Sequence, residues 1–295
     1  LLEEVDLETE TLDGHRVLLM ANIETTHEIR SVRKFGAQGI GLYRTEFLYL
    51  GNSLPTENEL FEDFKKVVEN MDPYPTVIRT LDIGGDKFLR DMNQNAENNP
   101  ALGLRGIRMS ISYPQVFINQ LKGILRASLY GKVKILFPMV SFVDEIIEAN
   151  KFLESAKCDL RSKQIPFDEK VQIGAMIETP ASAVCIDQII DLVDFISIGT
   201  NDLIQYVLAV DRTNENVAHL YQPFHPAIMR LLKDIFRAAN NSNKTVSICG
   251  ELGGNPMATM LLLGLGKVNE LSMDPHSIPK VKKVIRGVSL PDAKA

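Results

Sequence analysis

Short apolar stretches alternate with amphipathic stretches along the chain. Each apolar stretch is four to seven residues long, and most are followed by glycine or a polar residue, which is typical of a buried strand. Eight stretches have this form, at residues 17–21, 40–43, 77–81, 133–137, 171–177, 195–198, 246–249 and 268–271. Between them apolar residues recur at helical spacing, as at residues 26–35, 143–153 and 228–239. The pattern therefore predicts strands and helices in alternation.

Eight strands that alternate with helices over about 250 residues fit a (β/α)8 barrel, or TIM barrel, better than an open sheet. Residues 99–108 are expected to form a loop that leads into a helix, so the longest connections follow the second and third strands. No stretch rich in proline, glycine and serine divides the chain. We therefore expect one barrel domain at residues 17–295, preceded by a short lead-in at residues 1–16.

Composition and charge indicate which partners and which cellular compartment such a barrel has. With 32 basic and 38 acidic residues the net charge is −6, which argues against nucleic acid or an anionic membrane as the main partner. No apolar run approaches the length of a membrane span. The first residues are acidic, unlike a signal peptide, and the chain lacks an initiator methionine, so we expect a fragment of something longer. Three cysteines without CxxC spacing favour a reducing cytoplasm.

A strand end and a helix start meet within a few residues in the stretch 194–212. The predicted strand stops before Gly199, and Thr200, Asn201 and Asp202 then precede a helical repeat of apolar residues. Backbone N–H groups at such a junction favour an anion, and Asp202 could hold a metal ion. Alternatively, Asn201 and Asp202 only cap the helix, and this stretch alone does not decide between the two interpretations.

Polar side chains gather at the carboxyl ends of the predicted strands. Because these ends converge on one mouth of a parallel barrel, where such enzymes place their active sites, the side chains are expected to lie together. They are Arg44, Thr45 and Glu46 after the second strand, Arg79, Asp82, Asp86, Lys87, Arg105 and Arg108 after the third, Glu178 after the fifth, Asn201 and Asp202 after the sixth, and Cys249 and Glu251 after the seventh.

Arginine and lysine side chains at this mouth imply a ligand with more than one anionic group, since arginine pairs bidentately with phosphate and carboxylate. A single arginine is more often a weak surface ion pair, and this is the interpretation for Arg108. The combination of Arg44, Arg79 and Arg105 favours a ligand instead.

Two carboxylates and a cysteine complete the candidate site. Glu178 and Asp202 come from neighbouring strands, a usual arrangement for Mg²⁺ shared with a phosphate. Without the arginines they would be a helix-capping pair or an acid–base couple. Cys249 ends a strand inside the glycine-rich stretch 247–254, where the backbone can approach a ligand closely. A single cysteine at a strand end is more often a small core residue, but its place at the mouth favours a functional role.

Six motifs stand in a fixed order along the chain, at residues 39–50 (GIGLYRTEFLYL), 79–87 (RTLDIGGDK), 99–105 (NPALGLR), 178–181 (ETPA), 194–212 and 247–252 (SICGEL). With them, residues 17–283 resemble the C-terminal domain of the enzyme I family of the bacterial sugar phosphotransferase system, the phosphoenolpyruvate–protein phosphotransferases. The barrels of pyruvate phosphate dikinase and phosphoenolpyruvate synthase share several of these motifs. Close spacing without large insertions favours enzyme I.

This resemblance implies a barrel of the phosphoenolpyruvate/pyruvate type, and an Mg²⁺-dependent transfer of the phosphoryl group from phosphoenolpyruvate (PEP) to a histidine, with release of pyruvate. Positioning and charge neutralisation dominate such a transfer, which suits arginines and Mg²⁺. The implied roles are phosphate binding by Arg44, Arg79 and Arg212, substrate binding by Arg105, Asn201, the Asp202 backbone and Lys87, Mg²⁺ binding by Glu178 and Asp202, and protonation of the enolate carbon by Cys249.

Part of the family's pattern has no counterpart in this sequence. In these enzymes the phosphorylated histidine lies in a separate N-terminal domain, and neither that domain nor the helical domain that docks the carrier protein HPr matches this chain. We therefore expect the PEP-binding half of the enzyme, incomplete for turnover until the N-terminal half is supplied. Family members dimerise through this barrel, so the resemblance also implies a homodimer.

Three alternatives stay open. The first is the corresponding barrel of the dikinase or the synthase, whose parent proteins require a nucleotide. The second is a carbon–carbon lyase of the citrate-lyase or phosphoenolpyruvate-mutase type, which would need Mg²⁺ and carboxylates but not four arginines and a cysteine. The third is a non-catalytic barrel that senses PEP through dimerisation.

Overall fold

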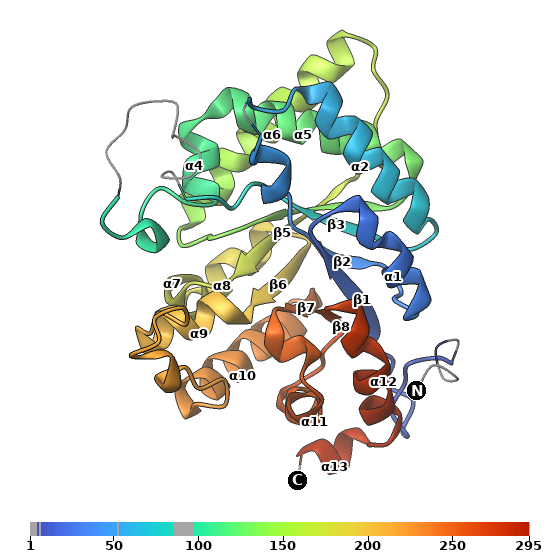
Figure 1. Cartoon of the computed structure of the whole chain (residues 1–295), viewed down its shortest axis with the longest axis vertical. Helices are drawn as coiled ribbons and strands as arrows, with labels where there is room; N and C mark the ends of the chain where they lie inside the picture. The colour runs from blue at the N-terminus through green and yellow to red at the C-terminus, as the bar shows by residue number, and fades with distance from the viewer. Residues whose placement is uncertain (1–4, 6, 52, 85–96, 295) are drawn as a thin grey trace.

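The protein is described by a computed structural model over residues 5, 7–51, 53–84 and 97–294 (Figure 1). Eight parallel strands close into a barrel in which each strand pairs with its neighbours in chain order and β1 pairs with β8. This confirms the predicted (β/α)8 barrel. The strands are β1 (Leu18–Ile23), β2 (Ile40–Tyr43), β3 (Thr76–Arg79), β4 (Val133–Phe137), β5 (Gln172–Ile177), β6 (Phe195–Gly199), β7 (Thr245–Cys249) and β8 (Glu270–Met273).

The strand ends differ from the predicted ones by at most two residues. β8 starts at Glu270 rather than at residue 268, and the side chain of Asn269 before it accepts the N–H of Val246 at 3.0 Å. β3 ends at Arg79 rather than at residue 81, and the N–H of Leu81 donates to the side chain of Gln120 at 3.0 Å. A bond between a side chain and the backbone therefore lies at each of these two ends, and an apolar pattern does not reveal it.

Helices surround the barrel, with α2, α5 and α6 on one side and α10, α11 and α12 on the opposite side (Figure 1). No helix of the described ranges has both the length and the apolar character that crossing a membrane requires. The helices are α1 (Ile29–Lys34), α2 (Glu57–Met71), α4 (Ile107–Ser112), α5 (Pro114–Ala127), α6 (Val143–Ser162), α7 (Pro180–Val184), α8 (Ile186–Ile189), α9 (Thr200–Leu208), α10 (Pro226–Asn241), α11 (Pro256–Leu265), α12 (Ile278–Arg286) and α13 (Leu290–Lys294).

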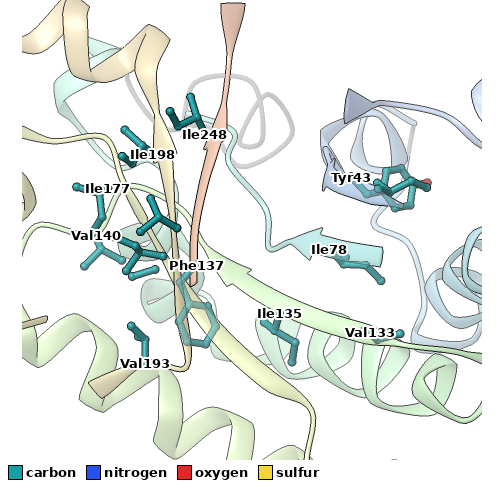
Figure 2. Close-up of a cluster of buried hydrophobic side chains, with 14 of the residues drawn as sticks. Tyr43, Ile78, Val133, Ile135, Phe137, Val140, Ile177, Val193, Ile198 and Ile248 are labelled. Atoms are coloured by element: carbon teal, nitrogen blue, oxygen red, sulfur yellow. The ribbon is translucent and has the colours of Figure 1, made fainter. Parts of the chain in front are cut away.

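Two hydrophobic layers pack on the barrel wall, because side chains alternate across each strand. The outer layer faces the helices, and Figure 2 shows part of it, including Ile135 and Phe137 of β4. The inner layer contains one residue from each of the strands β2 to β7, namely Leu42, Val77, Leu136, Met176, Phe195 and Cys249. Cys249 is thus both a core residue and the last residue of its strand.

The segment before β1 lies against α12. Glu10 and Arg16 form an antiparallel bridge, and the ammonium group of Lys282 donates to the carbonyl oxygens of Val5 and Leu7 at 2.6 and 2.9 Å. The division between a lead-in at residues 1–16 and the barrel stays a prediction.

We expect Gly41→Ala to lower the free energy of unfolding by about 1–3 kcal/mol, because β2 has no room for a methyl group there. A Cβ atom at this position would lie 2.6 Å from the Cβ of Ser272 on β8 and 2.9 Å from that of Met20 on β1. Gly51→Ala is the control, since its nearest neighbour would be the Ser53 backbone oxygen at 3.7 Å. Denaturant unfolding compares the two variants, and equal stability would contradict the tight packing.

Candidate functional site

A cavity of about 440 Å³ opens at the carboxyl ends of the strands. It gathers side chains that follow β2, β3, β5, β6 and β7. Lys87, one of the predicted site residues, lies outside the described residues. Asp86 also lies outside the described residues, and Thr45 and Glu251 do not line this cavity. The other residues with a predicted role in binding or catalysis all line it, namely Arg44, Arg79, Arg105, Glu178, Asn201, Asp202, Arg212 and Cys249. Arg108 is not among the lining residues of the described chain, and its Nε lies 3.5 Å from Glu145 Oε1.

Arg79 is the most deeply buried arginine of the cavity, with 8% of the residue exposed. Its Nη2 lies 2.8 Å from Oε1 of Glu46, and its Nη1 lies 2.9 Å from Oδ2 of Asp82. Burial alone would lower the pKa of Arg79, but the charges of Glu46 and Asp82 outweigh burial and raise it. The buried Nε has no hydrogen-bond partner among the described residues, so the protein leaves one donor of this guanidinium unused.

Arg105 connects two carboxylates. Its Nε and Nη2 donate to Asp82 at 2.9 and 3.1 Å, and its Nη2 and Nη1 donate to Asp202 at 3.0 and 3.3 Å. Nη1 also donates to the hydroxyl of Tyr206 at 3.1 Å. Burial acts to lower the pKa of Arg105, whereas Asp82 and Asp202 raise it above its ordinary value. Asp82 therefore bridges Arg79 and Arg105.

Two further arginines lie at the rim of the cavity. Nη1 of Arg44 lies 2.7 Å from Oε1 of Glu24, and Nη1 of Arg212 lies 3.1 Å from Oε1 of Glu251. Their side chains are 34% and 41% exposed, so solvent screens these pairs and each arginine can exchange its partner at little cost.

Glu178 is buried at the end of β5, where its Oε1 accepts the N–H of Met139 at 2.6 Å. Burial, together with the nearby charges of Asp202 and Asp82, raises the pKa of Glu178 to about 8. Glu178 therefore carries a proton at neutral pH unless a cation enters the site.

The donor set of Glu178 and Asp202 suits magnesium better than a softer metal, because both side chains offer carboxylate oxygens. The two carboxylates repel one another, which contributes to the raised pKa of Glu178. A bound cation would relieve this repulsion. Across the described ranges, no three Asp, Glu, His or Cys side chains are grouped closely enough to hold a metal ion by themselves. Mg²⁺ usually takes only one or two carboxylates and completes its shell with water and ligand oxygens, so the pair fits that ion.

Cys249 presents a protonated thiol to the cavity. Its Sγ lies 3.1 Å from Oγ of Ser197 and 3.4 Å from the carbonyl oxygen of Ile198, and the residue is 1% exposed. Burial raises the pKa of Cys249 to about 11, although the hydrogen bond with Ser197 acts to lower it. At neutral pH the side chain can therefore donate a proton but is a poor nucleophile.

Asn201 and Asp202 do not cap α9. The N-cap residue is Gly199, and both side chains belong to the first turn of the helix. Oδ1 of Asn201 accepts the N–H of Glu251 at 3.0 Å, so it ties the loop after β7 to the end of β6, while Asp202 binds Arg105. The helix-capping interpretation is therefore wrong for both residues.

The sequence did not reveal which carboxylates hold the arginines. Glu46 and Asp82 follow their strands visibly, but spacing does not show which arginine each one pairs with. Glu24 follows β1, a strand for which no site residue was predicted. Tyr206 was also missed, although it lies four residues after Asp202 on a helix, a spacing that places both side chains on one face.

Fold and cavity together define a (β/α)8-barrel protein whose strand ends carry an arginine- and carboxylate-lined cavity of the size that small-molecule sites have. Residues 2–290 match the family described as PEP-utilising enzyme, PEP-binding domain. The chain belongs to this family.

Two relatives that cover nearly the whole chain share a name. The phosphoenolpyruvate-protein phosphotransferase of Haemophilus influenzae is 48% identical over 290 residues, which is 98% of this chain and 50% of the relative. The protein of the same name from Buchnera aphidicola subsp. Acyrthosiphon pisum is 47% identical over 290 residues, 98% of this chain and 51% of the relative. These relatives confirm the resemblance to enzyme I. The chain spans about half the length of the curated relatives it matches.

Solved structures extend the likeness to more distant barrels. A citrate lyase from Burkholderia xenovorans superposes with a TM-score of 0.57 at 13% identity, covering 96% of this chain and 80% of that one. At this identity the likeness shows the shared fold alone.

The raised pKa of Glu178 makes stability depend on pH. The value is about 8 in the folded chain, against about 4.3 for an unfolded glutamate. Between these values the folded state holds a proton that the unfolded state has lost, so this residue lowers stability progressively as pH rises through that window.

We expect Glu178→Gln, in metal-free buffer, to match the parent near pH 5 and to exceed its free energy of unfolding by about 1–3 kcal/mol near pH 9. The substitution keeps an acceptor for the Met139 N–H and removes the titration. Denaturant unfolding at both pH values measures the difference, with Glu148→Gln, which changes a partly exposed residue of α6, as control. A difference independent of pH would contradict the raised pKa.

Proposed function

We propose that this chain is the PEP-binding catalytic domain of a phosphoenolpyruvate–protein phosphotransferase, which passes the phosphoryl group of PEP to a histidine and releases pyruvate. The observation that carries the proposal is one cavity that brings four arginines together with the carboxylates of Glu178 and Asp202 and a protonated thiol. The names of the relatives support the same reaction.

Phosphate binding is assigned to Arg44, Arg79 and Arg212. Each of these side chains is paired with a carboxylate of the protein, so an anion must compete for it, and a ligand with several negative charges competes best. Lys87 remains in the proposed substrate-binding set.

The rest of PEP is assigned to Arg105, Asn201 and the backbone of Asp202. The last two lie in the first turn of α9, where backbone N–H groups lack partners within the helix and favour an anion. Glu178 and Asp202 would hold Mg²⁺, which when bound neutralises negative charge on the leaving enolate.

Cys249 is assigned the role of the acid. Its S–H bond breaks as a C–H bond forms at the methylene carbon of the enolate, which gives pyruvate and a thiolate that water reprotonates. Burial suits this role, because it keeps the proton on sulfur until a stronger base arrives.

The phosphoryl acceptor is proposed to be a histidine on an N-terminal domain of the same protein, from which HPr receives the group for sugar uptake. The greater length of the relatives and the family resemblance support this part of the proposal. The same resemblance supports a homodimer, which sedimentation over a range of concentrations tests, and three free cysteines support a cytoplasmic location.

Calorimetric titration of PEP tests the binding site. We expect Mg²⁺-dependent binding to this chain, and Arg79→Ala should weaken it roughly ten- to a hundredfold, because a charge-assisted contact contributes about 1.5–3 kcal/mol. Arg161→Ala is the control, since Arg161 is an exposed residue of α6 outside the cavity. No binding of PEP to the parent chain would refute the proposed function.

Exchange of the methyl protons of pyruvate tests the proposed role of Cys249 as the acid. In D₂O with Mg²⁺, the chain should exchange the methyl protons of pyruvate with solvent, and Cys249→Ala should slow this exchange by about 10²-fold or more while PEP binding persists. Proton NMR follows the methyl signal, and Cys185→Ala serves as the control because that cysteine lies between α7 and α8. Unchanged exchange in Cys249→Ala would assign the acid to another group.

A further inference from the structure

Three buried hydrogen bonds connect α5 to the ends of β2 and β3. Nε2 of Gln120 donates to Oγ1 of Thr45 at 3.0 Å, and its Oε1 accepts the N–H of Leu81 at 3.0 Å. Oγ1 of Thr45 in turn donates to the carbonyl oxygen of Arg79 at 3.0 Å. Thr45 and Gln120 are 0% and 1% exposed. We refer to these bonds as the Gln120–Thr45 bridge.

Gln120 places a polar side chain on the buried face of α5. Apart from Lys122, the other buried residues of α5 carry no polar side chain, and they include Phe117, Leu121 and Ile124. Burying an amide costs free energy unless its polar atoms find partners, and here both the amide nitrogen and the amide oxygen do so. An apolar side chain would fill this space without that constraint, so the amide points to a task that packing alone does not set.

The bridge reaches the residues on both sides of the buried guanidinium. Thr45 lies between Arg44 and Glu46, and its hydroxyl holds the carbonyl of Arg79. Leu81 precedes Asp82, so the bond from Gln120 fixes the backbone next to that carboxylate. Glu46 and Asp82 are the two carboxylates that orient the guanidinium of Arg79.

None of the bridge residues Gln120, Thr45 and Leu81 is among those that line the cavity in the described part of the chain. Their effect on a ligand must therefore pass through the backbone and through Glu46 and Asp82. A displacement of a fraction of an ångström at these strand ends would move the guanidinium relative to a bound phosphate, where geometry matters steeply.

We propose that Gln120 and Thr45 are positioning residues that hold Arg79 in place for the phosphate of PEP. The inference rests on the proposed function, and it adds that α5, outside the barrel, sets the geometry of the phosphate subsite. Of the other assigned residues, Asn201 and Asp202 lie on α9 and Cys249 ends β7, elements that the bridge does not touch, and only Arg105 reaches it, through Asp82. A ligand without phosphate therefore depends on the bridge much less than PEP does.

Affinities for PEP and for pyruvate, both with Mg²⁺, separate this role from a general loss of structure. Thr45→Val keeps the shape of the side chain and removes the hydroxyl, whereas Thr45→Ser keeps the hydroxyl. We expect Thr45→Val and Gln120→Leu to weaken PEP binding by about tenfold and to change pyruvate binding by less than about twofold. Thr45→Ser should bind PEP nearly as the parent chain does.

Calorimetry gives the affinity for PEP, and ligand-observed NMR gives that for pyruvate. Thr259→Val is the matched control, because it removes the 3.1 Å bond from a buried hydroxyl of α11 to the carbonyl oxygen of Asn255, the N-cap residue of that helix, away from the cavity. Equal losses for both ligands, or no loss for PEP in Thr45→Val, would overturn the positioning role. If the parent chain binds neither ligand, the proposed function itself fails; if it binds both, only the comparison of variants decides the inference.

Discussion

Asp82 accepts hydrogen bonds from Arg105 and pairs with Arg79, and this shared carboxylate is the contact on which the rest of the site depends. Two buried guanidinium groups repel one another and have lost their hydration. Carboxylates that lie between them offset both costs. Glu46 and Asp202 continue the alternation of charge on either side. The network extends from the end of β2 to the first turn of α9, so it joins strand ends that the barrel alone would leave independent.

Among the described hydrogen bonds and ion pairs, Glu178 is the carboxylate of the cavity that contacts no arginine or lysine directly. Its burial therefore raises its pKa. Cys249 shares this low-dielectric setting, since it closes the inner hydrophobic layer of the barrel. Two acids that hold protons at neutral pH therefore lie beside arginines that are permanently charged. The arginines of the cavity are paired with carboxylates, and Glu178 and Cys249 are protonated. A cation or an anion that enters the cavity therefore changes these pairings or these protonation states.

Hydrogen bonds outside the cavity and at its edge also hold the strand ends of the site together. Thr45 and Gln120 tie the ends of β2 and β3 to α5, and Asn201 ties the loop after β7 to the end of β6. A barrel presents its strand ends on separate loops, which differ in their freedom to move. Hydrogen bonds that cross from one strand end to another turn these loops into one surface, and a phosphate or a carboxylate can then be held by several of them together.

The sequence by itself determined the number, order and approximate bounds of the strands, because apolar runs and helical repeats depend on which faces are buried. It also placed Arg44, Arg79, Arg105, Glu178, Asn201, Asp202 and Cys249 at strand ends or in the connections after them, and a parallel barrel sends all such ends to one mouth. Only the tertiary structure decided which carboxylate pairs with which arginine, that Asn201 and Asp202 do not cap α9, and that Gln120 holds the end of β3. Those contacts join residues far apart in the chain, so their partners are set by the register and closure of the barrel rather than by any local pattern.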